Sequence, residues 1–280
     1  MKPLVYIIIV NWNGEKVIID CLNSLSRLDY DNYKILVVDN NSSDNSVNEI
    51  NRLFPTVRVL ELNKNYGFTE GNNKGFMSIL EDNPKYVIFL NNDTEVDPNF
   101  IKPLVTALEK NPKTGQTVPK IYYADQRNKI WFAGGKINLW AGQIKHIGIR
   151  KNDSDEFNIS KETHYATGCC FAMCTTDFNE LGGFDPSYPM YCEDVDLSLR
   201  MKNKGQIVYF VPDSKVYHKI SSSIGGEFAV KKIFRKIKGY IKLFQMHTFL
   251  LQKFTIGISW LFAIPYFIIK LAYFRIIRND

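Results

Sequence analysis

Runs of apolar residues alternate with helix-like segments along the first 110 residues of the chain. Four short runs predict β-strands because β-branched and aromatic residues dominate them: residues 4–10, 33–39, 56–62 and 85–90. Helical spacing of apolar positions predicts four helices: residues 15–28, a helix capped by Ser43 or Asp44 that runs to Phe54, one within 69–81, and one that starts at Pro98. Apolar strands joined by helices are typical of a parallel, doubly wound α/β sheet.

The pattern changes after about residue 115. Short β segments punctuated by glycine, such as "KIWFAGGKIN" and "GQIKHIGI", predict a small antiparallel part. We expect the charged stretch 150–162 to be a flexible surface loop. The second half then predicts a strand at 168–174, a helix over 192–204 and a strand at 206–212. One α/β domain over residues 1–227 is therefore expected, with halves at 1–112 and 113–227 and a separate tail at 228–280.

Polar side chains follow each strand of the first half. They are Asn11 to Gly14, Asp39 to Ser42, "NKNYGFTEGNNKG" at 63–75, and Asn91-Asn92-Asp93. Each cluster alone is consistent with a simple turn or helix cap. In a doubly wound sheet, however, ligands bind beyond the carboxyl ends of the strands, where all four clusters would meet. Together they predict a polar pocket with at least one carboxylate, which suits a sugar nucleotide.

The glycines of this region do not predict a triphosphate or NAD site. Gly67, Gly71 and Gly75 are spaced by four, which fits neither a P-loop nor a GxGxxG fingerprint. Small residues at this spacing instead let a helix approach the sheet or a ligand closely.

Asp93 is the candidate ligand for a divalent cation. A diphosphate leaving group concentrates negative charge, and Mg²⁺ or Mn²⁺ bound by carboxylate oxygen would neutralise it. Asn91 or Asn92 would add an amide oxygen or bind the sugar. The alternative is a capped turn before the helix that starts at Pro98.

A second candidate segment is "GGFDPSYPMYCEDVDLSLRMKNKG" at 182–205. Glu193, Asp194 and Asp196 open an amphipathic helix there. Acidic residues favour a helix N-terminus through its dipole, which is a purely structural explanation. The same dipole keeps a carboxylate ionised, as a general base must be. His218 follows the last predicted strand, a position that is more often a surface position than a ligand.

Composition narrows the class of protein. A hydrophobic content of 45% and an aromatic content of 14% are enough for a core. The five cysteines have no paired CxxC spacing, so small buried residues in a reducing compartment are expected rather than a metal site. The first apolar run is too short for a signal peptide and lacks a cleavage site, so we expect a first strand and a cytoplasmic protein.

Positive charge is concentrated in the tail. Residues 231–280 carry ten Lys/Arg and one acidic residue, about +9, against +6 for the whole chain. Residues 228–250 mix these charges with apolar residues at helical spacing, and residues 256–274 are nearly apolar apart from Pro265 and Lys270. An amphipathic segment lying on an anionic membrane is favoured. The alternatives are a single spanning helix, at the margin of the required length, and a helical appendage packed on the domain.

Six ordered segments resemble glycosyltransferase family 2 over roughly residues 3–225, most closely bacterial rhamnosyltransferases of cell-surface polysaccharide assembly. They are "VYIIIVNWNG", "ILVVDNNSSD", "NYGFTEGNNKG", "FLNNDTEVDP", "GGFDPSYPMYCEDVDLSLR" and "VYHKISSS". The resemblance implies a GT-A fold, a nucleotide diphosphate sugar donor, a divalent metal and inversion at the anomeric carbon. The first half would bind the nucleotide and the second the acceptor.

The resemblance also implies roles for individual residues. Asp39 would contact the nucleoside, Asp93 and His218 would bind the metal, and Asp194 would be the catalytic base. The remaining donor-side candidates are Asn11, Asn13, Glu15, Asn65, Gly67, Asn73, Asn91 and Asn92. The acceptor-side candidates are Glu193, Tyr191 and Gly168. Asn91 stands where the family's DxD-type motif has its first acidic residue, so charged metal ligands are fewer here.

These expectations define a function and its rivals. We expect transfer of a sugar, first of all rhamnose from dTDP-rhamnose, to a glycan or lipid-linked saccharide hydroxyl. A UDP-hexose donor and a non-catalytic nucleotide-sugar or glycan-binding module are the alternatives. A nucleic-acid-binding protein would need basic and aromatic residues in the groove, whereas the predicted pocket is rich in carboxylates, so nucleic acid is not an expected partner.

Overall fold

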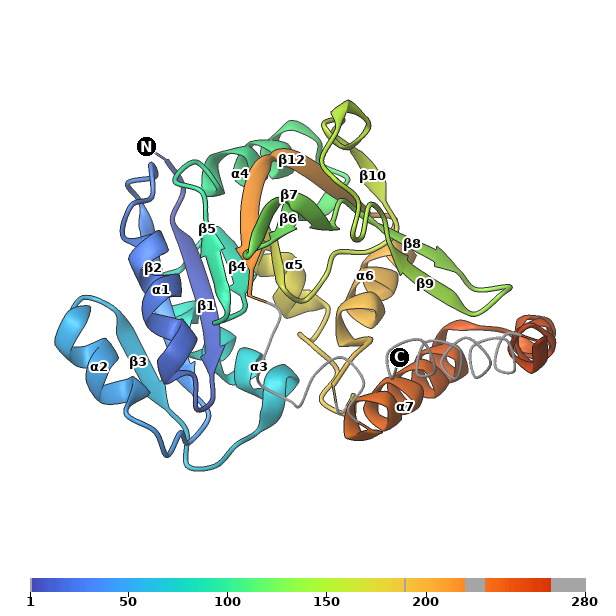
Figure 1. Ribbon diagram of the computed structural model, residues 1–280, viewed down its shortest axis with the longest axis horizontal. Helices are drawn as coiled ribbons and strands as arrows, with labels where there is room; N and C mark the ends of the chain where they lie inside the picture. The colour runs from blue at the N-terminus through green and yellow to red at the C-terminus, as the bar shows by residue number, and fades with distance from the viewer. Residues whose placement is uncertain (1, 189, 220–229, 263–280) are drawn as a thin grey trace, which may run out of the picture.

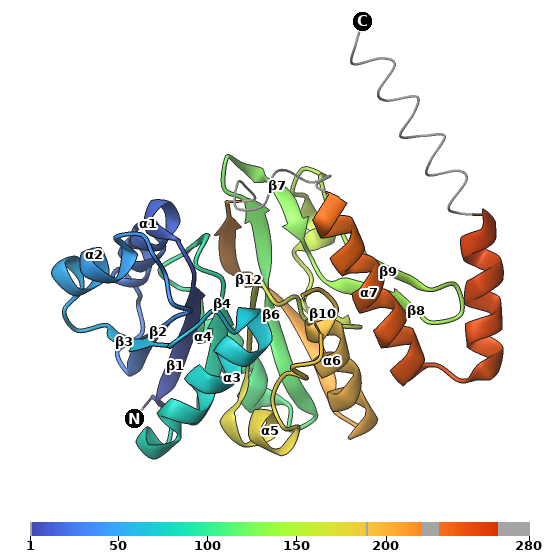
Figure 2. The ribbon, with the colours of Figure 1, turned by 90° about the horizontal axis from the view of Figure 1, so that it is seen from below.

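The computed structural model describes residues 2–188, 190–219 and 230–262 of the chain. In this part of the chain a ten-stranded mixed sheet crosses the molecule, and helices lie on both of its faces (Figures 1 and 2). The four strands predicted for the first half are all present: β1 (Val5–Asn11), β2 (Tyr33–Asp39), β3 (Arg58–Glu61) and β4 (Tyr86–Leu90).

These four strands are parallel, in the order β4-β1-β2-β3. Their register aligns the strand ends, because Asn11 lies beside Asp39 and Asp39 beside Glu61. The connecting helices are α1 (Glu15–Leu25), α2 (Ser46–Leu53) and α3 (Gly67–Ile79). The N-cap position of α2 is Asn45, one residue later than predicted, although Asp44 accepts a hydrogen bond from the Ser46 backbone N–H at 3.1 Å.

Helix α3 packs unusually close to the sheet, as the glycine spacing predicted. A Cβ at Gly75 would lie 2.5 Å from a methyl carbon of Val38 and 3.1 Å from one of Ile8. A Cβ at Gly71 would lie 3.2 Å from Val10. The α3 backbone therefore rests directly on β1 and β2, and this contact carries the preceding loop to their carboxyl ends.

The second half, together with β5 (Thr94–Val96), extends the sheet through mainly antiparallel pairings. The strands of the second half in this sheet are β6 (Thr114–Tyr123), β7 (Gln126–Phe132), β10 (Lys161–Thr163), β11 (Cys170–Cys174) and β12 (Ile207–His218). The full order is β10-β12-β6-β11-β4-β1-β2-β3, with β5 paired to β12 and β7 to β6. The hairpin of β8 (Gly135–Asn138) and β9 (Gln143–His146) forms a separate small sheet. The α/β class with an antiparallel part is confirmed.

The remaining helices of the domain are α4 (Ile101–Lys110), α5 (Thr175–Glu180) and α6 (Glu193–Asn203), with 3-10 turns η1 (Leu80–Asp82) and η2 (Asp155–Phe157). An aromatic cluster joins β4 to α5 and to the loop that follows it. The ring of Phe89 on β4 lies 4.6 Å from Phe178 on α5 and 5.2 Å from Phe184, between ring centroids. This cluster fixes the start of the loop that leads into α6.

Two predictions about the second half of the domain were wrong. The strand predicted at 206–212 continues as β12 to His218, across a register shift between Val211 and Lys215 that interrupts the apolar pattern. The stretch 150–162 is more than a surface loop, because it contains η2 and the start of β10. Within it, Asp153 forms an ion pair at 3.0 Å with Lys120, whose side chain is 1% exposed. A buried ammonium group needs such a partner, which anchors the stretch to β6.

Two C-terminal helices pack beside this domain, α7 (Val230–His247) and a helix over residues 250–262 (Figure 2). Of the predicted apolar stretch 256–274, residues 263–274 lie outside the described residues. Among the described residues, no helix is both long and apolar enough to cross a membrane.

Candidate active site

The ends of β1 and β2 form a buried polar cluster. Asn11 is fully buried, and its side-chain amide donates to Asp39 Oδ1 at 3.2 Å and to Ser46 Oγ at 3.0 Å. Asp39 is 2% exposed, and its Oδ2 accepts the Ser42 backbone N–H at 2.8 Å. Buried polar groups must be hydrogen-bonded to be tolerated, so this network holds the strand ends in fixed positions.

Exposed residues of the donor-side prediction surround this cluster. Asn13 adopts a left-handed conformation (φ 50°) and its side-chain oxygen accepts the Ser43 backbone N–H at 2.8 Å. Glu15 begins α1 and is exposed. Asn65 accepts the backbone N–H of Gly67 at 2.8 Å, and Gly67 itself has a φ of +77°. These exposed residues follow the ends of the strands, and their predicted contact with the donor stays a prediction.

Asn73 differs from its neighbours in the donor-side set. Its amide donates to the carbonyl of Phe184 at 2.8 Å and its carbonyl oxygen accepts the Phe184 N–H at 2.9 Å. Both polar groups of the side chain therefore join α3 to the loop before α6. In this arrangement Asn73 links the two halves of the domain.

The end of β4 joins the same cluster. The Asn92 amide donates to Asn11 Oδ1 at 2.9 Å, and the Asn91 backbone N–H donates to the Cys169 carbonyl at 2.9 Å. A Cβ at Gly14 would lie 2.1 Å from Asn11 Oδ1 and 2.5 Å from Asn92 Nδ2, so only glycine fits beside this pair. The Asn91-Asn92-Asp93 sequence thus lies against the end of β1.

Asp93 and His218 meet because β5 pairs with the end of β12. Asp93 Oδ1 lies 3.2 Å from His218 Nε2, with side-chain exposures of 18% and 11%. Asp93 Oδ1 and His218 Nδ1 are nevertheless buried without a hydrogen-bond partner. Burial alone would lower the pKa of His218, but the adjacent Cys169 and Asp93 raise it to about 10. The expectation of an exposed His218 was wrong, because β12 is longer than its apolar pattern.

Asp93 and His218 are suitable as two of the ligands of a divalent cation. Mg²⁺ commonly takes one or two protein carboxylates together with waters and substrate phosphates, and imidazole is a further suitable ligand for Mn²⁺. Orphaned buried acceptors such as Asp93 Oδ1 are the atoms that a cation would satisfy. No cluster of three or more His, Cys, Asp or Glu side chains is present among the described residues, so the remaining ligands would come from substrate and water.

The carboxylate predicted as a base lies at the first turn of α6. Asp194 Oδ2 accepts the Gly168 backbone N–H at 2.8 Å, and Oδ1 accepts the Val195 N–H at 2.8 Å. Burial raises its pKa, and these hydrogen bonds oppose the rise. Glu193 is buried beside it, and its Oε2 has no hydrogen-bond partner. Burial, and then the charge of Asp194, raise the pKa of Glu193 to about 8.

Hydrogen bonding distinguishes the two carboxyl groups. Asp194 receives two backbone donors, which stabilise its ionised form, whereas Glu193 Oε2 has no partner. Of two adjacent carboxyl groups, the better-bonded one ionises first. The ionised form is therefore better stabilised at Asp194 than at Glu193.

Segment 168–169 links Asp194 to the Asp93–His218 pair. Gly168 holds Asp194, and its neighbour Cys169 accepts the Asn91 N–H and lies against His218. Because consecutive Cα atoms are about 3.8 Å apart, these contacts bring the two functional groups to one place. The acceptor-side candidates lie near Asp194 in different ways. Gly168 donates a hydrogen bond to its carboxylate, whereas Tyr191 and Glu193 precede it in the chain. Tyr191 and Cys192 both have positive φ, at 72° and 73°, a strain of about 1–3 kcal/mol each.

Sequence analysis missed the role of Asp196. This side chain is fully buried and accepts hydrogen bonds from Arg200 Nε at 2.8 Å and from His247 Nε2 at 2.7 Å. The spacing of four between Asp196 and Arg200 was a signal for an ion pair on one helix face. The partner from α7 lies 51 residues away in the chain and left no local signal.

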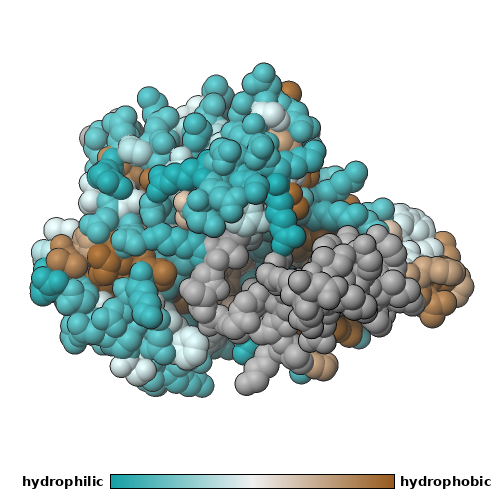
Figure 3. Space-filling view, in the orientation of Figure 1, coloured by the Kyte–Doolittle hydropathy of each residue, from teal (hydrophilic) through white to brown (hydrophobic). Residues whose placement is uncertain are grey.

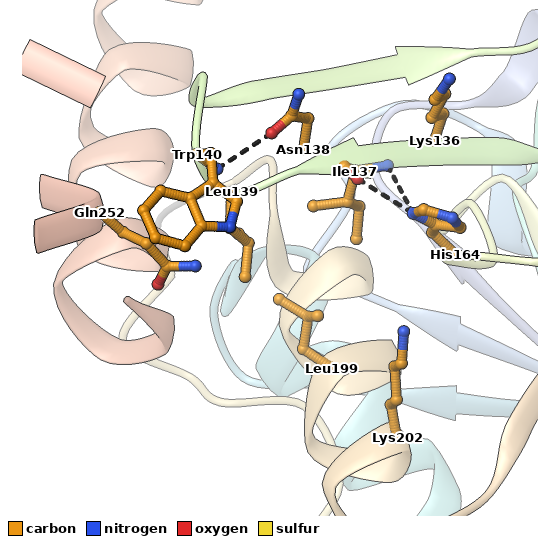
Figure 4. Close-up of a pocket in the computed structure, with 9 residues that line it drawn as sticks. All are labelled: Lys136, Ile137, Asn138, Leu139, Trp140, His164, Leu199, Lys202 and Gln252. Atoms are coloured by element: carbon orange, nitrogen blue, oxygen red, sulfur yellow. Dashed lines mark hydrogen bonds between the residues drawn. The ribbon is translucent and has the colours of Figure 1, made fainter. Parts of the chain in front are cut away.

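A cavity of about 350 Å³ lies elsewhere, between the β8–β9 hairpin, α6 and helix 250–262 (Figure 4). Lys136, Trp140, His164 and Lys202 are among its lining residues. None of the predicted site residues lines it. The close-up shows that the long side chains lining the cavity come from separate elements.

Comparisons with known proteins agree with this geometry. The family model described as "Glycosyl transferase family 2" matches residues 6–182. The N-acetylglucosaminyl-diphospho-decaprenol L-rhamnosyltransferase of Mycobacterium tuberculosis is 25% identical over 251 residues, covering 81% of this chain and 80% of the relative. The Rhamnosyltransferase WbbL of Escherichia coli is 27% identical over 224 residues, covering 77% of this chain and 83% of the relative.

A solved structure supports the same fold. The crystal structure of GalNAc-T7 with UDP, GalNAc and Mn²⁺ matches with a TM-score of 0.69 at 20% identity. The match covers 87% of this chain and 48% of that one, so this chain spans about half of GalNAc-T7. At this identity the likeness supports the fold. Glu193, Asp194 and His218 lie beyond the segment matched by the family model, so their placement rests on the geometry described above.

Replacement of Glu193 by Gln is expected to change how stability depends on pH. A folded-state pKa of about 8, raised from 4.5, means that the folded chain keeps a proton that the unfolded chain releases. The free energy of unfolding should therefore fall as pH rises from about 4.5 to 8, and this loss should be smaller in the variant. Urea unfolding at pH 5 and pH 8 measures it, with Glu81→Gln, an exposed glutamate, as control. Equal pH dependence in wild type and Glu193→Gln would contradict the assignment.

Proposed function

The chain belongs to glycosyl transferase family 2 and is a glycosyltransferase, and from that premise we propose that it transfers a sugar with inversion from a nucleoside diphosphate donor to a saccharide hydroxyl. The proposal rests above all on segment 168–169, which brings Asp194 next to the Asp93–His218 pair. Such an arrangement supplies the two requirements of the reaction, a proton acceptor and a group that neutralises a departing diphosphate.

The base would be Asp194. Ionised through its two backbone hydrogen bonds, it would accept the proton of the acceptor hydroxyl as that oxygen attacks the anomeric carbon. The C–O bond to the diphosphate breaks on the opposite face, which inverts the configuration. Glu193, neutral at the same pH, would leave Asp194 as the single negative charge next to the acceptor. General-base assistance of this kind is worth about 10²–10⁴-fold in rate.

Asp93 and His218 would hold a divalent cation, whose chemistry is to neutralise the charge that develops on the diphosphate. The Mn²⁺ and UDP present in the GalNAc-T7 structure support a cation and a nucleoside diphosphate for this fold. Asp39 and the exposed residues Asn13, Glu15 and Asn65 would face the nucleoside.

Rhamnose is the first candidate sugar, because two relatives that match most of this chain are named as rhamnosyltransferases. dTDP-rhamnose is then the donor to test first, and UDP-hexoses are the alternative. The Mycobacterium tuberculosis relative is named for a diphospho-decaprenol-linked acceptor, which supports a lipid-linked saccharide as acceptor here and a role in cell-surface polysaccharide synthesis. A binding module without catalysis is disfavoured, because Asp194 and Asp93 are both in place.

We also propose that the C-terminal helices bind the cytoplasmic surface of the plasma membrane. Large apolar residues are exposed along them: Ile233, Phe234, Ile237, Ile241, Met246, Phe249, Leu250, Leu251, Phe254, Ile258, Leu261 and Phe262. The apolar colour at the right-hand end of Figure 3 corresponds to helix 250–262. Exposed Arg235, Lys238 and Lys253 lie among them. Exposed apolar residues together with basic ones are typical of helices that lie in an anionic interface.

Replacement of Asp194 by Asn is expected to lower turnover by about 10²–10⁴-fold, because the amide cannot accept the proton. Donor affinity should stay within about twofold, since Asp194 faces the acceptor. Transfer rates with dTDP-rhamnose and UDP-hexoses, together with calorimetric donor binding, measure both effects. Near-normal turnover in this variant would contradict the role of Asp194.

Replacement of Asp93 by Ala is expected to abolish the metal-dependent part of nucleotide binding. Wild type should be stabilised by one of dTDP, UDP, GDP or CDP only when Mn²⁺ or Mg²⁺ is present. Ligand at about 100 times its dissociation constant contributes roughly 2.7 kcal/mol, which is visible as a shifted melting temperature. Asp125→Asn, an exposed carboxylate on the β6–β7 turn, serves as control. An Asp93→Ala protein with an unchanged metal-dependent shift would overturn this role.

Binding to membranes is expected to require the exposed apolar face. Full-length protein should sediment with anionic vesicles at low salt, and less at high salt, because the basic residues act through screened charge. Phe254→Glu combined with Leu261→Glu should weaken sedimentation strongly. Met77→Glu, which changes an exposed apolar residue on α3, should leave it unchanged. Membrane binding through these helices would be contradicted if the double variant and Met77→Glu sedimented equally. It would also be contradicted if the wild type did not sediment with the vesicles.

A further inference from the structure

The loop between α5 and α6, residues 181–192, is held at both of its ends. At its start, Arg200 of α6 donates to the carbonyls of Leu181 at 2.7 Å and Gly183 at 2.8 Å. At its end, Tyr191 and Cys192 adopt left-handed conformations that are rare for residues with side chains. The next residues are Glu193 and Asp194, so the loop fixes where the first turn of α6 begins.

Helix α7 contacts this loop directly. Lys242 forms an ion pair with Asp185 at 3.0 Å. A Cβ at Gly239 would lie 2.5 Å from the carbonyl oxygen of Tyr191, so α7 presses its backbone against the left-handed turn. Burial, together with the charges of Cys192 and Asp194, raises the pKa of Tyr240 to about 12, which places this α7 side chain close to the base.

Asp196 connects α7 to α6 in the same region. Its carboxylate is fully buried and receives Arg200 on one oxygen and His247 of α7 on the other, with the His247 side chain 8% exposed. Because a carboxylate only accepts hydrogen bonds, His247 Nε2 carries the proton and donates it. Tyr188 Oη also donates to the oxygen that accepts from His247, at 3.4 Å. The loss of His247 therefore leaves Asp196 Oδ1 with only this long hydrogen bond, two residues from Asp194.

From these contacts we infer that α7 is a positioning element for the reaction: His247 and Gly239 hold the left-handed turn at 191–192 and thereby place Asp194 against Gly168. The inference rests on the proposed role of Asp194 as base. In Figure 2, α7 lies alongside α6. The helix that carries part of the exposed apolar surface is therefore also the helix that fixes the base.

Ordinary helix packing makes a different prediction. A methyl at position 239 would lie 2.5 Å from the Tyr191 carbonyl oxygen, so either the turn or α7 must move. If α7 is merely an appendage, the helix moves away and stability falls, but turnover is unchanged. If the contact with Tyr191 positions the base, the added methyl displaces the turn and turnover falls.

The test uses full-length wild type, His247→Ala, His247→Gln, Gly239→Ala and the control Gln245→Ala, which changes an exposed residue of α7. Hydrogen exchange across residues 183–200, nucleotide diphosphate affinity, and kcat and KM are measured for each. His247→Ala and Gly239→Ala should expose residues 185–194 to faster exchange and lower kcat by about 10²-fold, the usual effect of a misplacement of about 1 Å. Nucleotide affinity should stay unchanged, because the donor site lies on the other half.

His247→Gln should restore both exchange protection and kcat, since its side-chain nitrogen can donate to Asp196 from a similar position, and Gln245→Ala should match wild type. Unchanged exchange and kcat in His247→Ala and Gly239→Ala would overturn the inference. So would a glutamine variant as impaired as the alanine variant, or loss of nucleotide binding together with kcat, which indicates general unfolding. If wild type transfers no sugar from any donor, the proposed function fails, and the exchange experiment still decides whether α7 holds the loop.

Discussion

The antiparallel pairing of β11 with β4 is the constraint on which the site depends. Parallel strands bring only their carboxyl ends to one edge, which supplies Asn11, Asp39 and Asn91. An antiparallel strand next to them begins at that same edge, and Cys170 lies beside Leu90 in the register. The residues just before β11 therefore reach the polar cluster and present backbone groups to it. One of those groups, the Gly168 N–H, donates to Asp194, the proposed base.

The same edge separates charges that would otherwise repel one another. Asp39 accepts hydrogen bonds from Asn11 and Ser42, Asp93 lies against His218, and Asp194 accepts two backbone N–H groups. Glu193 lacks such support, and its raised pKa keeps it protonated near neutral pH. For a site that binds a nucleoside diphosphate, as proposed, uncompensated carboxylates would be unfavourable, because like charges would repel the ligand.

A strained backbone and a buried carboxylate both occur at the first turn of α6. Two consecutive left-handed residues precede it, and the buried Asp196 within it depends on both α6 and α7. Strained backbone persists only where surrounding structure holds it, and here the holding contacts come from Arg200, Lys242 and Gly239. Helix α7 therefore contacts the segment that precedes Asp194, in addition to carrying an exposed apolar face.

The sequence by itself determined the parallel half of the sheet, because apolar strand runs and helical spacing are local patterns set by burial on one or both faces. It also determined that polar residues gather beyond β1, β2 and β4, since chain direction fixes which end of a parallel strand they follow. Tertiary structure alone decided that β12 reaches His218 and that Asp153 compensates Lys120, because both depend on partners distant in the chain. The same reason explains the Asp196–His247 contact. A local sequence pattern indicates that a residue is buried. Which residue it then pairs with depends on how helices distant in the chain pack against each other.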